Sequence, residues 1–306
     1  MDVEGLNMLA IPHISICVCT FRRVELLKQL LGALDSQKTD DTFTYSVVIA
    51  DNDCTRSAES MVTEFRSATG MRVDYCAEPR RNIALARNKA LERANGELVA
   101  FIDDDELPVD HWLMSLFKTY NEFGVEGILG PVLPYFDRDA PQWVRKGGFY
   151  DRPNHAKGRL MSWSECRTGN VLFRKGIING IDTPFCSEFD TAGEDMDFFR
   201  RMIDKGFVFR WCNDAIVYEF VPPARCRVGF LIKRALLRGS NFSKHQQSHL
   251  SHFLRSVVAV PTYTLALPLL ALCGPHMFLK YLVKLCDHSS RLLAFAGWRV
   301  MTEREM

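Results

Sequence analysis

This 306-residue chain has no CxxC motif, and its first residues lack the basic and apolar pattern of a signal peptide. The ten cysteines form no CxxC pair and no regular framework, and a chain of this length buries a core without disulfide staples. We therefore expect reduced thiols, as in a cytosolic protein. The first fifteen residues are acidic where a signal peptide needs basic residues, so we expect no export.

Acidic residues are scarce in the last part of the chain. The whole sequence carries 38 basic and 37 acidic residues, but residues 222–306 hold 12 of the basic and only 3 of the acidic ones, which gives this region a net charge of +9. Residues 1–221 carry −8 and show no basic stripe, so no nucleic acid partner is expected. The basic residues of the tail flank apolar stretches, a pattern typical of contact with an anionic membrane surface.

Strand and helix patterns alternate through the first half of the chain. Apolar strands are expected at about residues 13–20, 46–50, 71–76 and 97–102, and helical spacing of apolar residues follows the first two and precedes the last. This order predicts an α/β fold with a doubly wound, mostly parallel sheet, in which ligands bind beyond the carboxyl ends of the strands. Thr20, Asp51 and Asp103 fall at such ends, and their convergence predicts a site there.

The stretch FIDDDELP (101–108) places three carboxylates directly after a buried strand. Side chains alternate across a strand, so Asp103 and Asp105 are expected on one side and Asp104 on the other. Two oxygen ligands at this spacing suit one hard divalent cation beside a diphosphate. The alternative is an acidic loop on a solvated surface, but the position behind a buried strand favours a site.

The stretch GEDMDF (193–198) carries Glu194 and Asp195 at a helix that is predicted to begin near Thr191. Thr191 and Glu194 fit a capping box, in which the acid serves only the helix. Transfer of a sugar to an alcohol needs a carboxylate base, so the two acids are also candidates for catalysis. Both interpretations stay open at this point, and so does the choice of Asp195 over Glu194 as the base.

Residues 137–164 are predicted to be irregular and contain four aromatic residues, Trp143, Phe149, Tyr150 and Trp163. Long loops of this kind are often functional, and aromatic faces can stack on sugars. The alternative, that these rings merely cover the core, is equally consistent with the sequence.

Six stretches, in this order and at these separations, resemble the family 2 glycosyltransferases with a GT-A fold: ISICVCTFRR, VVIADND, NIALARNKAL, FIDDDELP, TGNVLFRK and GEDMDFFRR. The similarity extends over about residues 12–240 and is strongest to bacterial exopolysaccharide glucosyltransferases of the succinoglycan type. The resemblance implies an inverting enzyme that uses a UDP-sugar donor and Mn²⁺ or Mg²⁺. It also implies transfer of glucose to a lipid-linked oligosaccharide.

The resemblance further implies roles for single residues around the nucleotide. Thr20, Phe21 and Arg22 would border its pocket, Asp51 would meet the uracil, and Arg87 would lie near the nucleotide.

The remaining implied roles concern the metal, the sugar and the base. Asp103 would lie near the ribose or the metal and Asp105 on the metal. Asn170 would line the donor-sugar or acceptor region, and Asp195 would be the general base with Glu194 beside it. Many family members have a histidine where this chain has Tyr218-Glu219, so Glu219 is at most a candidate third ligand.

The resemblance and the charge asymmetry divide the chain into a GT-A domain at 1–222 and a basic, apolar, helical region at 223–306. Residues 256–279 contain no Asp, Glu, Lys or Arg and are long enough to cross a bilayer, but three prolines argue against a plain spanning helix. We expect a re-entrant or interfacial segment at the cytoplasmic face of the inner membrane, with Lys280, Lys284 and Arg291 helping to hold it there. A single span, a water-soluble hairpin and a dimer contact are the alternatives.

Three histidines of the tail, His245, His249 and His252, follow one another at helical intervals. They could bind a metal, but a solvated helix face is the favoured interpretation because no cysteine or acid accompanies them.

Two other functions remain as alternatives. A sugar nucleotidyltransferase needs a glycine-rich phosphate loop after the first strand, and TFRR (20–23) is not one. A non-catalytic scaffold of a polysaccharide assembly complex would need neither Asp105 nor Asp195.

Overall fold

The computed structural model describes residues 11–189, 193–241 and 249–298, and the chain divides into two compact units. Unit 1 comprises Met1–Leu133 and Arg152–Glu219, and unit 2 comprises Pro134–Asp151 and Phe220–Met306. The chain passes from unit 1 to unit 2 for the last time after Glu219, close to the predicted boundary after residue 222, whereas residues 134–151 also belong to unit 2. The division into the domains 1–222 and 223–306 stays a prediction.

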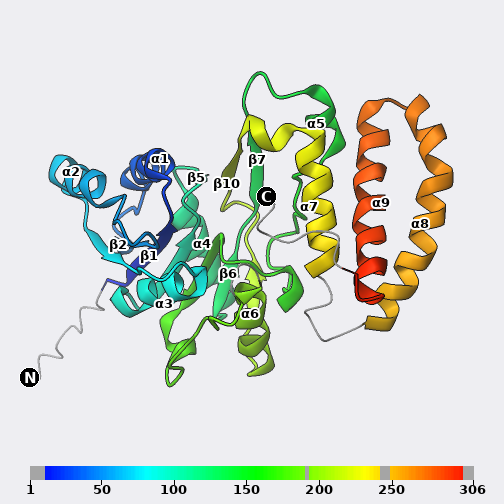
Figure 1. Cartoon of the computed structure of the whole chain (residues 1–306). Helices are drawn as coiled ribbons and strands as arrows, with labels where there is room; N and C mark the ends of the chain where they lie inside the picture. The colour runs from blue at the N-terminus through cyan, green and yellow to red at the C-terminus, as the bar shows by residue number, and fades with distance from the viewer. Residues whose placement is uncertain (1–10, 190–192, 242–248, 299–306) are drawn as a thin grey trace, which may run out of the picture. The chain divides into compact units, whose positions relative to one another are not determined.

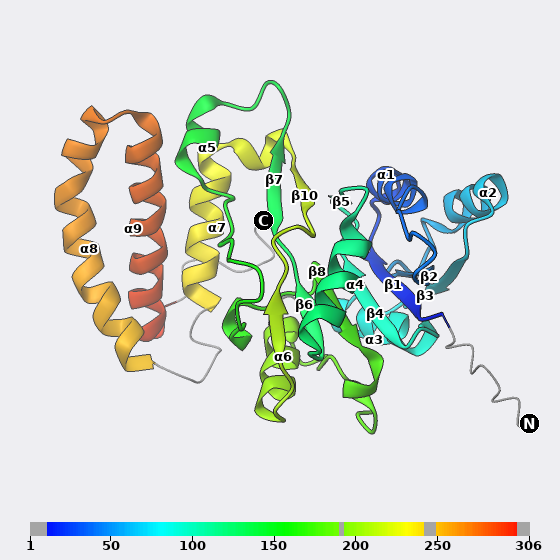
Figure 2. The same cartoon turned by 180° about the vertical axis from the view of Figure 1, so that it is seen from behind.

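Unit 1 contains a seven-stranded sheet in the order β3-β2-β1-β4-β8-β6-β9 (Figures 1 and 2). Its strands are β1 (His13–Thr20), β2 (Thr44–Asp51), β3 (Val73–Ala77), β4 (Leu98–Ile102), β6 (Gly127–Leu129), β8 (Asn170–Arg174) and β9 (Phe209–Trp211). All pairs are parallel except those that β8 makes with its two neighbours. The predicted mostly parallel α/β sheet is therefore confirmed, with β8 as the antiparallel exception.

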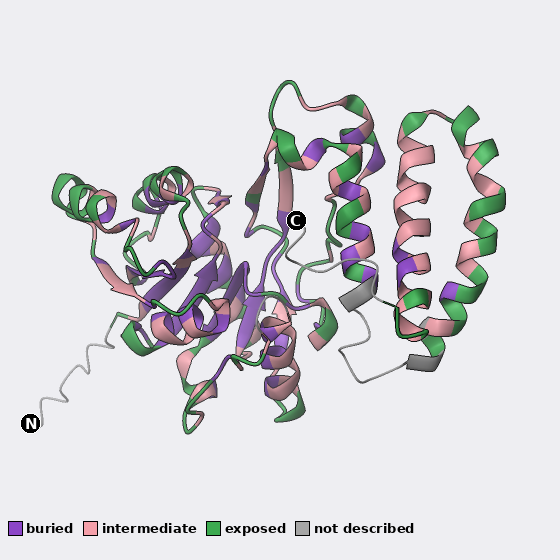
Figure 3. Cartoon of the chain, in the orientation of Figure 1, coloured by how far each residue is buried: buried purple, intermediate pink, exposed green. Residues whose placement is uncertain are grey.

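Helices cover both faces of this sheet. Ile14, Ile16 and Val18 of β1 pack on one face with α1 (Val24–Asp35), α2 (Glu59–Thr69) and α4 (Trp112–Phe123). Cys17, which points the other way, packs with α3 (Ile83–Arg93) and α6 (Glu194–Asp204). Because both faces are buried, the central strands are continuous apolar runs without polar alternation (Figure 3).

The register of the strands brings their carboxyl ends to one edge. Thr20, the last residue of β1, pairs with Asp51, the last residue of β2, and β4 ends on the other side of β1 immediately before Asp103. The chain then forms β5 (Glu106–Pro108), which pairs with β10 (Val217–Val221) in a three-stranded sheet of order β5-β10-β7, where β7 is Val132–Phe136.

Unit 2 is mainly helical, with α5 (Gln142–Gly147), α7 (Val228–Asn241), α8 (His249–Leu272) and α9 (Pro275–Phe295). Helix α9 lies between α7 and α8 (Figure 1) and packs against both. The approach to α7 is close, since a Cβ atom at Gly239 would lie 2.4 Å from the carbonyl oxygen of Asp287. Asp287 also accepts hydrogen bonds from Arg238 at 3.0 Å and Arg291 at 3.1 Å.

The aromatic residues of the segment 137–164 pack against apolar clusters. Trp143 and Tyr150 cover Val144 in unit 2, and Trp163 packs on the face of the unit 1 sheet that carries α3. These contacts favour the interpretation in which the rings cover the core.

Candidate active site

Asp104 and Asp105 share one arginine at the carboxyl edge of the sheet. Asp104 is buried and accepts hydrogen bonds from Thr20 Oγ1 at 2.8 Å and from Arg23 Nη1 at 2.9 Å. The same Arg23 nitrogen donates to Asp105 Oδ2 at 3.0 Å. Asp104 thus ties the end of β1 to the end of β4, a structural role. The sequence analysis gave Arg23 no role. Its position just after the end of a strand, close to the expected site, could have indicated one.

Asp103 faces more solvent and is less strongly paired. Its side chain is 45% exposed, and the nearest guanidinium nitrogen, Arg87 Nη2, lies 3.8 Å from its Oδ1. Desolvation within the site raises the pKa of Asp103 to about 6 against the opposing effect of Arg87, and the charges of Asp105 and Asp104 raise it further. Asp103 therefore holds a proton more readily than an ordinary carboxyl does.

Glu106 is a fourth carboxylate that the sequence analysis did not single out. It is buried, its Oε2 accepts from the backbone N–H of Asp103 at 3.2 Å, and its Oε1 has no hydrogen-bond partner among the described residues. Burial and the charge of Asp103 raise the pKa of Glu106 well above its usual range. Gly169 leaves room here, because a Cβ atom on it would lie 2.7 Å from Glu106 Oε1.

The carboxylates beyond the end of β4 are the candidate donors for a divalent cation. Within the described residues, no group of three or more His, Cys, Asp or Glu side chains is placed to hold a metal. Glu219, the candidate third ligand, forms an ion pair with Arg152. Asp103 and Asp105 remain as two hard oxygen donors, and Mg²⁺ is commonly held by one or two carboxylates together with substrate phosphates. The residues therefore fit a cation that shares its ligands with a diphosphate.

Asp51 is fully buried and committed to its own loop. Its Oδ1 accepts from the Asp53 N–H at 3.0 Å, and its Oδ2 accepts from the Ala58 N–H and the Tyr75 hydroxyl, both at 2.9 Å. These bonds fix the turn after β2. The predicted contact between Asp51 and uracil stays a prediction, and the bonds give the carboxylate a structural role in any case.

Phe21 and Arg22 lie beside that turn. The guanidinium carbons of Arg22 and Arg81 lie 5.2 and 4.9 Å from the Phe21 ring centroid, and Arg22 Nε donates to Asp53 Oδ2 at 3.0 Å. Arg22 has a positive φ of 56°, a strained conformation for a residue with a side chain and one that is enriched at functional sites. An aromatic ring flanked by cations is suited to contact a planar, anionic ligand.

Arg87 and Glu194 form a buried ion pair between α3 and α6. The Asn82 side chain caps α3 by accepting from the N–H groups of Ala84 and Leu85, which places Arg87 in the second turn. Glu194 Oε2 is buried and has no hydrogen-bond partner in the described part of the chain. Arg87 therefore contacts both Glu194 and Asp103. Arg87 and Glu194 are 107 positions apart in the sequence.

Helix α6 begins at Glu194, and its N-cap residue is Gly193 with φ 109°, so the predicted start near Thr191 is wrong. Glu194 is the first residue of the helix and not the third, which is the position of the acid in a capping box. Thr191 itself lies outside the described residues. Glu194 is buried in its ion pair with Arg87, whereas the Asp195 side chain is 16% exposed. Asp195 Oδ1 accepts from the Met196 N–H at 2.7 Å, and Arg167 Nε lies 3.9 Å from its Oδ2.

Asn170 uses its side chain inside the fold. It is buried, accepts from Trp112 Nε1 at 2.8 Å, and donates to the carbonyl oxygens of Pro131 at 3.0 Å and Ala215 at 2.7 Å. These bonds hold β8 against its neighbours and leave one acceptor lone pair. The predicted position of Asn170 beside the donor sugar or acceptor gains no support from them.

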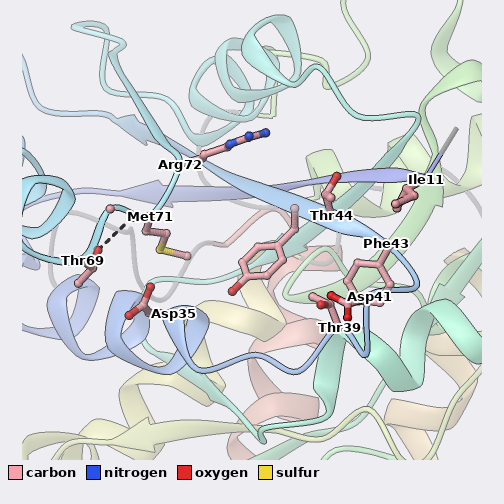
Figure 4. Close-up of a pocket in the computed structure, with 11 residues that line it drawn as sticks. Ile11, Asp35, Thr39, Asp41, Phe43, Thr44, Thr69, Met71 and Arg72 are labelled. Carbon is pink, nitrogen blue, oxygen red and sulfur yellow. Dashed lines mark hydrogen bonds between the residues drawn. The ribbon is translucent and has the colours of Figure 1, made fainter.

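A pocket of about 450 Å³ lies at the other edge of the sheet (Figure 4). It is lined by residues at the beginning of β2 and before β3, including Thr44, Tyr45 and Arg72, and by none of the predicted site residues. Of the three tail histidines, His245 lies outside the described residues, and the side chains of His249 and His252 are not described, so the metal-binding alternative stays a prediction.

A mostly parallel sheet with carboxylates beyond the ends of its central strands is the arrangement of GT-A glycosyltransferases, and two solved structures share the fold. The mannosyltransferase PcManGT from Pyrobaculum calidifontis in complex with GDP-Man and Mn²⁺ is 19% identical, with a TM-score of 0.62, over 94% of this chain and 86% of that chain. S. aureus TarS 1–349 in complex with UDP is 18% identical, with a TM-score of 0.55, over 94% of this chain and 91% of that chain.

The family model described as "Glycosyl transferase family 2" matches residues 15–185, so the chain belongs to this family. The succinoglycan biosynthesis protein ExoM of Rhizobium meliloti (strain 1021) is 34% identical over 234 residues, which are 76% of this chain and 74% of that protein. The predicted family and its resemblance to succinoglycan-type enzymes are confirmed.

Proposed function

We propose that this glycosyltransferase transfers glucose, with inversion, from a UDP-sugar to a hydroxyl of a lipid-linked oligosaccharide in exopolysaccharide or cell-surface polysaccharide synthesis. The observation that carries the proposal is the buried Arg87–Glu194 pair. It joins Asp103, at the end of β4, to the start of α6, where the next residue is Asp195. A candidate ligand for the donor's metal and a candidate base are thereby held by one short chain of contacts.

The proposed reaction is a single displacement. The acceptor hydroxyl oxygen forms a bond to the anomeric carbon while the bond from that carbon to the UDP oxygen breaks, and Asp195 takes the hydroxyl proton. Asp103 and Asp105 would hold Mn²⁺ or Mg²⁺, which when bound neutralises the departing diphosphate. The basic side chains of Arg87 and Arg23 orient and space these carboxylates.

The donor and the pathway are proposed from relatives. TarS was solved with UDP and PcManGT with GDP-Man and Mn²⁺, which supports a nucleotide-sugar donor and a divalent metal. The preference for UDP and glucose rests on the resemblance to the succinoglycan type, which the similarity to ExoM supports. Phe21, Arg22 and Asp51 would then surround the uracil and its ribose.

The lipid-linked acceptor is proposed from the tail. Residues 222–306 carry a net charge of +9, and the described residues include one helix, Phe253–Leu272, that is long and apolar enough to cross a membrane by length and composition, with a mean hydropathy of 1.5. An enzyme held at the cytoplasmic face of the inner membrane meets acceptors that are themselves anchored there.

A donor screen tests the proposal. The purified full chain is incubated with UDP-glucose, UDP-galactose, UDP-N-acetylglucosamine or GDP-mannose, with and without Mn²⁺ or Mg²⁺, and with membrane extract as acceptor source. We expect release of UDP from UDP-glucose that requires both the metal and the extract. Release of nucleotide from GDP-mannose alone would overturn the choice of UDP, and no release from any donor would overturn the proposed reaction.

A further inference from the structure

The outer side of α8 is an apolar stripe without a partner among the described residues. Its exposed large hydrophobic side chains are Leu254, Val257, Val258, Leu265, Leu269 and Leu272. Their spacing follows the 3.6-residue period of one helix face, and the stripe extends over 19 residues, about 27 Å from its first to its last residue. Leu265, Leu269 and Leu272 are 79, 68 and 85% exposed. A continuous surface of this kind marks an interaction site.

The threonine hydroxyls beside the stripe form hydrogen bonds within the helix itself. The hydroxyls of Thr262 and Thr264 donate to the carbonyl oxygens of Val258 at 2.7 Å and Val260 at 2.8 Å, four residues earlier in the same helix. Bonds of this kind satisfy a hydroxyl inside an apolar medium. Arg255 is the charged residue of the stripe and lies near the first end of the helix, from which its long side chain can reach an aqueous boundary.

The opposite side of α8 is covered by α9 along most of its length. The rings of Phe253 and Phe295 lie 5.3 Å apart, and those of Tyr263 and Tyr281 lie 5.4 Å apart. Between them, Ser256 Oγ and His288 Nδ1 are 3.0 Å apart. The two helices therefore form an antiparallel hairpin.

This hairpin decides between a spanning helix and one that lies flat. Helix α9 carries Lys280, Lys284, Asp287 and Arg291 beside α8, and Lys284 Nζ lies 4.8 Å from the Tyr281 ring centroid. If α8 crossed the bilayer, these charges would enter the hydrocarbon core with it, which is strongly unfavourable. If α8 lies in the plane of the interface, only its outer stripe meets acyl chains and α9 stays on the aqueous side.

We propose that α8 lies in the interface plane of a membrane that contains anionic lipid, with the stripe from Leu254 to Leu272 facing the acyl chains and α9 behind it. The inference deepens, and rests on, the proposal of an enzyme at the membrane surface. A second copy of the chain is the other candidate occupant. Charge favours the lipid, because residues 222–306 carry 12 basic and 3 acidic residues and would repel a second copy but attract anionic head groups.

Vesicle flotation tests the occupant without using any glycosyl donor, so its outcome is separate from that of the donor screen. The purified full chain is mixed with vesicles of phosphatidylcholine, alone or with phosphatidylglycerol. We expect the chain to float with the anionic vesicles, and the variant Leu265→Ser/Leu269→Ser/Leu272→Ser to bind them at least tenfold more weakly. The matched control is Leu160→Ser, which removes a side chain that is 60% exposed in unit 1 and should leave binding unchanged.

The substituted leucines are exposed, so the triple variant should unfold at the wild-type temperature, and Leu269→Ser alone should give an intermediate loss. Wild-type protein that ignores both vesicle types, or a triple variant that binds as the wild type does, would overturn the proposal. A wild-type dimer that the triple variant converts to a monomer, without vesicle binding by either, would assign the stripe to a second copy.

The depth of labels tests the orientation. Val258→Cys, Leu265→Cys and Leu272→Cys are each made with Cys54→Ser and Cys273→Ser, which removes the two exposed native thiols, and each is labelled with an environment-sensitive dye. A helix in the interface plane gives equal quenching by lipids brominated at one depth for the three positions. A spanning helix gives depths that differ by up to about 21 Å over these 14 residues, and that result would overturn the in-plane orientation.

Discussion

The two units of this chain treat apolar and charged residues in opposite ways. In unit 1, both faces of the sheet are covered by helices, and the carboxylates of Asp103, Asp104 and Glu106 are gathered at one edge, two of them buried. In unit 2, buried apolar side chains form a small cluster around Val144, and the outer side of α8 stays exposed. The ion pair between Arg238 of α7 and Asp287 of α9 helps to join these two helices, and Arg291 pairs with Asp287 within α9.

The difference indicates what each unit still lacks. Unit 1 completes its own core and has an excess of negative charge, which a bound cation would balance in part. Unit 2 has an excess of positive charge and an uncovered apolar stripe, which an anionic lipid surface would balance and cover. Variants that affect one unit and spare the other test this difference between the units.

The largest effect is expected from Asp195→Asn. Loss of the proposed base should lower the rate of sugar transfer by roughly a hundredfold to ten-thousandfold, because general base catalysis contributes about that much. Vesicle binding through α8 should not change. Asp204→Asn, an exposed acid at the other end of the same helix, is the control and should retain full activity. Equal activity of both variants would exclude Asp195 as the base.

Glu194→Gln should lower the free energy of unfolding by about 3 kcal/mol, since it leaves the buried Arg87 charge without its main partner. Breaking a buried ion pair commonly costs about 3–5 kcal/mol of the free energy of unfolding. We expect the lower value because Asp103 remains 3.8 Å from Arg87. Chemical denaturation measures it.

The matched control is Glu92→Gln, which removes the exposed pair with Lys89 and should cost less than about 1 kcal/mol. Similar losses in both variants would show that the Arg87 pair is not buried as described.

Gly239→Leu should disturb unit 2 by about 2 kcal/mol, because a side chain there would clash with the Asp287 carbonyl oxygen between α7 and α9. Thermal unfolding should then show loss of helical signal, and vesicle binding should weaken with it. Gly229→Ala, in the same helix but with no atom of the described residues within 4 Å of its Cβ, should leave both unchanged. A stable Gly239→Leu variant would contradict the close packing of these helices.

The smallest effect concerns Asp103 and pH. Its pKa in the folded state is raised to about 6, above its usual value, so the folded state binds the proton more tightly than the unfolded state does. The resulting stabilisation is present at about pH 4 and is lost as the pH rises through 6. Asp103→Asn should therefore be the more stable protein at pH 7, by about 1 kcal/mol after allowance for solvent screening.

Denaturation of wild-type protein and of Asp103→Asn at several pH values, without added metal, measures this difference. It should shrink toward zero below about pH 3, under the ordinary carboxyl pKa of 3.8, where Asp103 is neutral in both states. A constant difference between pH 4 and 7 would mean that Asp103 titrates normally.

Sequence alone determined the features that are local in the chain. The alternation of strand and helix, the strand ends at Thr20 and Asp51, and the carboxylates after β4 follow from the period of apolar residues over short windows, and the resemblance of six short stretches indicated the family. The helix start near Thr191 was wrong because the capping box is a local pattern that Gly193 and the pairing of Glu194 override.

Tertiary structure alone decided which side chains meet. The Arg87–Glu194 pair joins residues 107 positions apart. Asn170, which the resemblance places in the donor-sugar or acceptor region, is held by Trp112 and two backbone carbonyls from other segments. The apolar run of α8 was visible in the sequence, but only its packing on α9 shows which side is free. Periodicity reports the burial preference of a residue; its partner depends on contacts between distant segments, which no short window contains.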